Sequence, residues 1–147
     1  MRYKIKPISS SDTLAIRHEV MWPNKPLEYI KLENDEEGKH FGLFVSDKLI
    51  AIISLFDKNG DVQFRKFATL NAFQGKGYGT ILLEKIIDLI ENEGHRKIWC
   101  NARGDKTEFY TKFGLKLTNN KFVKGGIEYV IMEKTFANFI QNHSQYK

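Results

Sequence analysis

The chain has 147 residues, a length that predicts one domain over residues 1–147 rather than two. Apolar residues make up 41% of the sequence and aromatic residues 13%, which excludes a disordered or collagen-like chain because enough apolar surface can be buried to offset the entropy of ordering. The net charge of +5 is concentrated in residues 95–147, which carry 10 Lys and Arg against 4 Asp and Glu, whereas residues 1–94 carry 13 against 14. The C-terminal part is therefore expected to attract an anion.

The N-terminal part is predicted to contain an edge strand and two helices. Apolar and basic residues alternate over residues 3–7, as in a half-buried strand, and Pro7 favours a sheet edge because proline cannot donate to a ladder. Side-chain oxygens at residues 9–12 then predict the start of a helix that runs through Val20. Its inner face is expected to carry Leu14, His18 and Met21. Residues 28–39 follow as a short helix that leads into an acidic loop.

Three strands in an antiparallel meander are predicted for the middle of the chain. Residues 41–45 and 49–56 are separated by a short turn, and the unbroken apolar character of the second segment indicates a strand that is covered on both faces. The pair Asn59 and Gly60 is typical of a hairpin turn and leads into a third strand over residues 62–70.

The C-terminal part is predicted to alternate helices and strands. Residues 80–93 have apolar side chains at helical spacing, and Gly94 ends this helix. Residues 97–102 alternate as a strand in which Cys100 and Asn101 point to opposite faces. A short helix capped by Asp105 or Thr107 is expected to bury Phe109 and Phe113, and the last two strands are expected at residues 115–122 and 127–135.

Glycines at positions 75, 77 and 79 lie between a predicted strand and the N-terminus of a predicted helix. A backbone without Cβ atoms can bend sharply and approach a ligand, and the first-turn amides with the positive end of the helix dipole can bind phosphate oxygens. The spacing matches neither a P-loop nor a Rossmann fingerprint in a first βαβ unit. The segment therefore predicts an anion site, and a tight turn without a ligand is the alternative.

This glycine segment and a second patch resemble the GNAT acyltransferase superfamily. The family's signature after its fourth strand is Gln/Arg-x-x-Gly-x-Gly/Ala, and a later block of the family has an Asn followed by Phe-Tyr-x-Lys-x-Gly-Phe. The matching residues are Gln74, Gly77 and Gly79 in the first patch, and Asn101 with residues 109–115 in the second. The element order agrees from Met1 to about Phe136. The resemblance implies an α+β fold with a central mixed, mostly antiparallel sheet of about seven strands flanked by four helices.

The resemblance implies transfer of an acyl group, usually acetyl, from acetyl-CoA to a primary amine by direct attack in a ternary complex, without a metal. The residues implied for cofactor binding are Phe67, Ala68, Thr69, Gln74, Gly75, Lys76, Gly77, Tyr78, Gly79, Thr80, Asn101 and Tyr110. The backbone of residues 74–80 would bind the pyrophosphate, and Asn101 would bind the pantetheine arm. Tyr110 would protonate the leaving thiolate as the catalytic acid. Packing of its ring is the alternative for Tyr110.

The acceptor side follows the family pattern less closely. Many members carry a Glu or Asp on the fourth or fifth strand that removes the amine proton, but residues 62–70 and 97–102 contain none, so the general base is unassigned. The residues expected to bind the acceptor are Arg17, Trp22, His40 and Arg65. Structural roles on the surface, in the core or at a strand end are the alternatives. The carboxylates of Glu33, Asp35, Glu36 and Glu37 would attract a cationic amine, or simply form a solvated loop.

Two other functions stay open, and the cellular setting is an expectation. A catalytically weak acyl-CoA sensor of the same fold is favoured by the missing acidic base, and a basic nucleic-acid-binding module is suggested only by the charge of the C-terminal part. We expect a cytoplasmic monomer or homodimer whose partner is a small-molecule or peptide amine, with neither nucleic acid nor membrane. No apolar run is long enough to span a bilayer, and a lone cysteine suits a reducing compartment.

Overall fold

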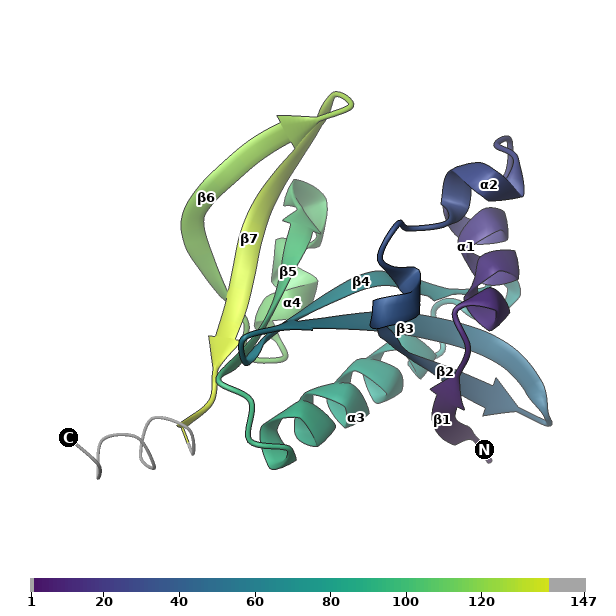
Figure 1. The fold of residues 1–147 in the computed structure, drawn as a ribbon, viewed down its shortest axis with the longest axis horizontal. Coiled ribbons are helices and arrows are strands. Elements are labelled where there is room, and N and C mark those ends of the chain that lie inside the picture. The colour runs from purple at the N-terminus through teal and green to yellow at the C-terminus, as the bar shows by residue number, and fades with distance from the viewer. Residues whose placement is uncertain (1, 138–147) are drawn as a thin grey trace. The chain divides into compact units, whose positions relative to one another are not determined.

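The computed structural model describes residues 2–137. The strands are β1 (Lys4–Ile8), β2 (Lys39–Val45), β3 (Lys48–Lys58), β4 (Asp61–Thr69), β5 (Lys97–Arg103), β6 (Lys116–Lys124) and β7 (Ile127–Thr135). The α-helices are α1 (Leu14–Met21), α2 (Leu27–Ile30), α3 (Tyr78–Asn92) and α4 (Thr107–Thr111). The strands form one sheet in the order β1-β2-β3-β4-β5-β7-β6 (Figure 1). The predicted α+β class, with a mixed and mostly antiparallel sheet of seven strands and four α-helices, is confirmed.

The chain divides into two compact units, which we describe separately. Unit 1 contains residues up to 56 together with residues 64–86, and unit 2 contains residues 57–63 together with those from 87 onward. In unit 1, β1 pairs with β2, and β2 pairs with β3, in antiparallel register. In unit 2, β7 lies between β5 and β6 and is antiparallel to both, while residues 61–63 of β4 pair with β5 in parallel. The expectation of a single domain stays a prediction.

Strand β3 forms the centre of unit 1. All of its residues from Ile50 to Phe56 are buried, which confirms the prediction of a strand covered on both faces. Strand β1 is at the edge of the sheet, as Pro7 predicted, and Pro7 lies opposite Phe41 of β2. Tyr3 precedes β1 and is 45% exposed, so the predicted half-buried strand is shifted toward Ile8.

Helix α1 buries a different face from the predicted one. Ile16 and Arg17 are buried, whereas Leu14, His18 and Met21 are only half-buried. The apolar cluster that α1 forms with β3 and β4 contains Ile16, Ile52 and Ala68, with Ile8, Val20, Met21, Leu49 and Leu70 packed against it. The predicted side-chain oxygens hold the 3-10 turn before α1, because Ser9 and Asp12 exchange side-chain to backbone hydrogen bonds of 3.1 and 3.2 Å.

Helix α3 begins at Tyr78, slightly earlier than predicted, and has the predicted apolar face. Its buried residues are Tyr78, Leu82, Leu83, Ile86, Ile87 and Ile90. Gly94 has a φ of +84° and donates to the carbonyl of Glu91, and the His95 amide donates to the carbonyl of Ile90. This left-handed residue ends the helix as glycine at this position predicts. None of the helices within residues 2–137 has the length and apolar character that crossing a membrane would require.

In unit 2, β5 alternates as predicted and α4 departs from its prediction. Ile98, Cys100 and Ala102 are buried, while Asn101 is exposed. Helix α4 ends at Thr111, so Phe113 lies beyond it. The predicted caps are wrong, because no side chain caps α4 and the Thr107 hydroxyl donates back to the carbonyl of Gly104 at 3.4 Å.

Candidate functional site

The predicted anion site lies in unit 1, where β4 ends and α3 begins. Gly75 and Gly77 have φ angles of +76° and +86°, which an L side chain rarely adopts. A Cβ atom built at either residue would meet nothing within 4 Å, so the backbone here borders open space. The amide of Ile81 donates to the carbonyl of Gly77 at 3.1 Å, which makes Gly77 the residue from which α3 starts. The first-turn amides, which have no carbonyl partner within a helix, are therefore placed beside an open and exposed loop.

Gln74 braces this loop from within unit 1. Its side-chain amide donates to the carbonyl of Thr69 at 2.9 Å and to the side-chain oxygen of Asn71 at 3.2 Å. The loop is thereby tied to the end of β4. Gln74 itself is exposed, and its role in cofactor binding stays a prediction.

The end of β4 that leads into the loop contains two aromatic rings in contact, those of Phe64 and Phe67. Ala68 is buried, and the ring of Phe67 lies 6.3 Å from that of Phe64 in an edge-on arrangement. A Cβ atom at Gly79 would lie 3.4 Å from the Phe67 ring and 3.6 Å from the Thr69 hydroxyl. These are ordinary van der Waals distances, so the first turn of α3 lies directly beside the end of β4 without requiring glycine at position 79. The candidate cofactor residues of unit 1 are thus the exposed loop and the half-buried Phe67 and Thr69, whereas Ala68 can contribute only through its backbone.

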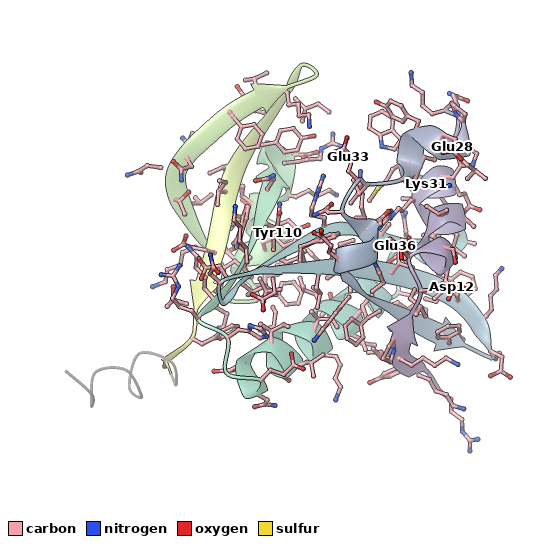
Figure 2. The ribbon with its side chains drawn as sticks, viewed as in Figure 1. Asp12, Glu28, Lys31, Glu33, Glu36 and Tyr110 are labelled. Atoms are coloured by element: carbon pink, nitrogen blue, oxygen red, sulfur yellow. The ribbon has the colours of Figure 1, made fainter. Side chains whose placement is uncertain are left out.

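Unit 2 contains the remaining candidate residues, Asn101 and Tyr110. Asn101 is exposed on β5 opposite Ile131 of β7. Tyr110 is half-buried in α4 (Figure 2), and its ring lies 5.3 Å from that of Phe109 in an edge-on arrangement. Tyr110 neighbours the Cys100 thiol, whose side chain is on the buried face of β5, whereas Asn101 is on the other face. Both candidates belong to unit 2, and Asn101 points away from the strand face that carries Cys100.

The environment of Tyr110 favours its protonated form. Burial, with a further contribution from Cys100, raises the pKa of the Tyr110 phenol above its usual range. Burial also raises the pKa of the Cys100 thiol to about 12, so that Cys100 is an uncharged side chain of the core. A phenol that keeps its proton at neutral pH can donate that proton to a developing thiolate.

Two of the predicted acceptor contacts, Arg17 and His40, are buried in a polar network of unit 1. Arg17 is fully buried, and its two terminal nitrogens donate to the carboxylate of Asp35 at 2.8 and 2.9 Å. One of them also donates to the Ser54 hydroxyl at 3.0 Å. His40, which is 4% exposed, contacts the Ser54 hydroxyl at 2.7 Å and the Asp35 carbonyl at 2.9 Å. Direct contact of Arg17 or His40 with an acceptor is therefore not supported, because both side chains are buried, and the terminal nitrogens of Arg17 and the ring nitrogens of His40 have internal partners.

Asp35 is consequently different from the other carboxylates of the predicted acidic loop. Burial alone would raise its pKa, but hydrogen bonds from Arg17 and from the Leu32 amide, together with the Arg17 charge, hold the pKa of Asp35 below its usual range. Glu33, Glu36 and Glu37 are exposed. The loop thus presents three carboxylates, while the fourth forms an internal ion pair.

This ion pair predicts how stability changes with pH. Because the folded-state pKa of Asp35 lies below its unfolded value near ~4, the ionised carboxylate contributes stability above that value and loses it as pH falls through the folded-state pKa. Asp35→Asn is expected to lower the free energy of unfolding at pH 7 by about 3 to 5 kcal/mol, because it leaves a buried guanidinium unpaired. The variant should also lose less further stability between about pH 5 and pH 3 than the parent does. Urea unfolding across this pH range measures both effects, and equal pH slopes in the two proteins would contradict the assignment.

The other two residues predicted to bind the acceptor, Trp22 and Arg65, are partly exposed to solvent. Trp22 is 39% exposed after α1, and its ring lies edge-on to Tyr29 at 5.3 Å. Arg65 of β4 is half-buried, with its guanidinium 5.9 Å from the centre of the Phe56 ring. Contact of either residue with an acceptor stays a prediction.

No carboxylate on β4 or β5 is available as a general base. Asp61 is the one acidic residue in these two fully described strands, and it begins β4 one residue before the predicted start. Arg96 forms a bidentate ion pair with Asp61 and lowers the pKa of that carboxyl. An ionised carboxylate held in this way is a poor proton acceptor.

Sequence reasoning missed Ser54 as a partner of both Arg17 and His40. The signal in the sequence was that Ser54 is a single hydroxyl residue within the apolar run of residues 49–56, where a covered strand was predicted. Such a residue in a core strand needs a hydrogen-bond partner.

Comparison with protein families and curated proteins shows which proteins the chain is similar to. A family model described as the acetyltransferase (GNAT) domain matches residues 8–136. The uncharacterized N-acetyltransferase YitI of Bacillus subtilis (strain 168) is 31% identical over 142 residues, which cover 90% of this chain and 95% of that protein.

Comparison with solved structures shows the same fold. A crystal structure assigned to the N-acetyltransferases, from Lactobacillus plantarum, has a TM-score of 0.81 at 20% identity and covers 92% of this chain and 99% of that chain. A Bacillus subtilis acetyltransferase in complex with CoA has a TM-score of 0.69 at 16% identity and covers 92% of this chain and 98% of that chain.

Proposed function

Because the chain belongs to the GNAT acetyltransferase family, we propose that it transfers an acetyl group from acetyl-CoA to the primary amine of a small molecule or peptide in a ternary complex. The observation that carries this proposal is the loop before α3, where two left-handed glycines border open space beside a helix N-terminus. The CoA-bound acetyltransferase of similar fold supports it. A turnover assay that follows release of free thiol tests it.

The backbone of residues 74–80 binds the pyrophosphate of acetyl-CoA. Amide hydrogens and the positive end of the α3 dipole stabilise the negative charge of the phosphates, and the glycines allow their oxygens to come close. Lys76 adds a positive charge on the same loop. Residues 67–69 of β4 offer backbone groups to the amides of the pantetheine arm, and Asn101 of β5 supplies a side-chain amide for the same arm.

The acyl transfer forms one bond and breaks one bond. The amine nitrogen bonds to the acetyl carbonyl carbon, the carbon–sulfur bond breaks, and sulfur leaves with the electron pair. A cationic amine first loses one proton to solvent so that its nitrogen can attack, and the nitrogen loses a second proton to solvent after attack. The phenol of Tyr110 gives its proton to the sulfur and is reprotonated from solvent. No side chain is assigned as the general base, because Asp61 is held by Arg96. A phenol, with a pKa of about 10, is a weaker acid than a thiol, with a pKa of about 8.5, and burial raises the pKa of Tyr110 further. The proton must therefore be delivered along a hydrogen bond between the phenol and the sulfur as negative charge develops there.

The exposed carboxylates of the acidic loop are proposed to attract the amine. Figure 2 shows Glu33 and Glu36 on the segment between α2 and β2. Changing Glu33, Glu36 and Glu37 to glutamine is expected to lower kcat/KM for a cationic amine by about threefold or more at low salt, because long-range attraction raises the encounter rate. The affinity for acetyl-CoA should not change. The effect should shrink as added salt screens the charges.

A control variant with the same change in net charge tests whether a change in kcat/KM comes from the acidic loop itself or from the net charge of the protein. Glu84→Gln, Asp88→Asn and Glu91→Gln remove three carboxylates from α3 and should leave kcat/KM for the amine near that of the parent. Steady-state kinetics at low and high ionic strength measure both triple variants. Equal kcat/KM values for the loop variant and the parent at low salt would leave the acidic loop without this role.

A second candidate function keeps the fold and the acetyl-CoA site but not turnover. The absence of an available carboxylate on β4 and β5 favours such an acyl-CoA sensor. Acetyl-CoA binding without amine-dependent thiol release would identify it.

A further inference from the structure

Two lysine side chains lie over the ring of Phe73, directly before the glycine loop in unit 1. The ammonium nitrogen of Lys48, the first residue of β3, is 5.5 Å from the ring centre, and that of Lys76 in the loop is 5.6 Å from it. Lys48 comes close to the loop because β3 begins beside the end of β4, where the Leu70 amide donates to the carbonyl of Ile50 at 2.9 Å. The fold therefore adds a cation that does not belong to the glycine segment of the sequence.

The Phe73 ring is fixed to the start of α3. It is half-buried and lies edge-on to the ring of Tyr78, the buried first residue of that helix, with 6.2 Å between the ring centroids. The Phe73 amide also donates to the carbonyl of Leu70 at 2.8 Å, which closes the turn between β4 and the loop. A ring face attracts cations, so Phe73 holds both ammonium groups at a defined place beside the first turn of α3.

The two ammonium groups lack a carboxylate partner. Lys48 and Lys76 are exposed, and neither forms an ion pair with any acidic residue among residues 2–137. Two like charges gathered at one ring repel each other, and an anion that contacts both offsets this repulsion. A phosphate monoester fits best, because it carries a charge of about −1.5 to −2 at pH 7 and has three acceptor oxygens, enough for two ammonium groups.

The proposed cofactor has a phosphate monoester close to the place where these cations lie. CoA carries a pyrophosphate, which the proposed function places at the backbone of residues 74–80, and a further phosphate on the 3′ oxygen of its ribose. The sugar alone separates this phosphate from the pyrophosphate, so it must lie close to the loop. Gly75, whose Cβ position has no atom within 4 Å, borders open space there.

We propose that Lys48, Phe73 and Lys76 form a subsite for the ribose 3′-phosphate of CoA. The two lysines bind the phosphate, and Phe73 is a positioning residue that holds them. This inference rests on the proposed function. It makes Lys48 a cofactor-binding residue from outside the glycine segment, and it makes the protein select CoA over dephospho-CoA.

A comparison of CoA with dephospho-CoA tests the subsite, because the two compounds differ only in the 3′-phosphate. Calorimetry at low salt is expected to show that the parent binds CoA about tenfold or more tightly than dephospho-CoA, since the charge-assisted contacts are lost with the phosphate. Lys48→Met removes the charge and keeps an unbranched side chain. It should weaken CoA binding about fivefold or more and leave dephospho-CoA binding at the parental value. Lys48→Met combined with Lys76→Met should bring the two affinities within about twofold of each other.

Lys6→Met is the matched control for the lysine variants. Lys6 of β1 is also an exposed lysine of unit 1 that lies over a ring, with its ammonium nitrogen 4.4 Å from the centre of the Phe44 ring. This variant should keep the parental preference for CoA.

Variants of Phe73 separate positioning from a general structural role. Phe73→Tyr keeps a ring and should retain the preference for CoA, whereas Phe73→Leu should lower it by weakening CoA binding alone. Equal loss of affinity for both compounds in folded Phe73→Leu would show that Phe73 does not position the lysines.

Equal affinity of the parent for CoA and dephospho-CoA, or a parental ratio of the two affinities in Lys48→Met, would overturn the subsite. Lys48 is exposed, so this variant should fold. Failure of the proposed function has a different signature. A parent that binds neither compound would overturn both proposals, whereas tight binding of both compounds without preference would overturn the subsite alone.

Discussion

Replacing Tyr110 with phenylalanine is expected to lower kcat by roughly 10²- to 10⁴-fold while acetyl-CoA affinity stays nearly unchanged. The substitution keeps the ring, which packs edge-on against Phe109, and removes only the hydroxyl. A phenol is protonated at neutral pH, and the upward shift of the Tyr110 pKa by burial leaves it so; the parent therefore has a proton to donate and the variant has none. A purely structural tyrosine would instead show a modest loss of stability and near-normal turnover.

Steady-state kinetics and calorimetry on the folded variant separate these roles. Tyr129→Phe is a matched control, because Tyr129 is also a half-buried tyrosine of unit 2, with its ring stacked on Phe122 at 5.3 Å. It should keep kcat close to the parental value. If Tyr110→Phe has a kcat within about threefold of the parent under conditions where chemistry limits turnover, Tyr110 has no chemical role.

Gly77→Val is expected to weaken acetyl-CoA binding at least about tenfold, since each lost charge-assisted hydrogen bond costs about 1.5 to 3 kcal/mol. The side chain would extend into the space that a Cβ atom at Gly77 finds open, where the pyrophosphate is proposed to lie. A branched residue also opposes the φ of +86°, which would move the loop amides away from the helix axis. Both effects act against phosphate binding.

Gly94→Val is a control that introduces similar backbone strain at a site away from the proposed pyrophosphate position. Gly94 has a φ of +84°, its Cβ position is equally open, and it lies at the other end of α3. The two variants should lose similar stability, because the same strain is introduced. Only Gly77→Val should change the affinity measured by calorimetry. Parental affinity in folded Gly77→Val would remove the loop from the cofactor site.

The parts of the fold that sequence predicted well are those with strong local signals. Three features depend only on residues close together in the sequence: the glycine loop, the apolar face of α3 and the continuous apolar run of β3. The structure contains all three features. The alternation of Cys100 and Asn101 on β5 is likewise set by the two-residue period of a strand. Gly94 ended its helix as expected because few other residues adopt a left-handed φ without strain.

The inner face of α1 could not be predicted from apolar spacing. The residue that the helix buries most completely is Arg17, and its burial depends on Asp35, Ser54 and His40, which come from separate segments of the chain. Charged residues are seldom fully buried without such partners. Helical spacing therefore predicted Leu14, His18 and Met21 on the inner face, whereas the structure leaves these three half-buried and buries Ile16 and Arg17 more completely.

The short helix α4 shows a similar limit for local signals. Phe109 and Phe113 have helical spacing, but the chain leaves the helix after Thr111 and the Leu115 amide donates to the carbonyl of Tyr110 at 3.4 Å. Gly114, with a φ of +89°, allows this early ending. The ring contact between Phe109 and Phe113, with centroids 5.0 Å apart, forms across the end of the helix rather than along it.

The most direct test of the central claim is release of free thiol from acetyl-CoA by the parent protein in the presence of a panel of primary amines. The proposed acetyltransferase predicts release that depends on the amine, matches the amount of acetylated amine, and falls by roughly 100-fold or more in Tyr110→Phe. Calorimetry on the same preparation should show acetyl-CoA binding. Binding of acetyl-CoA with no amine raising thiol release above the rate of hydrolysis would contradict the account and identify an acyl-CoA sensor instead.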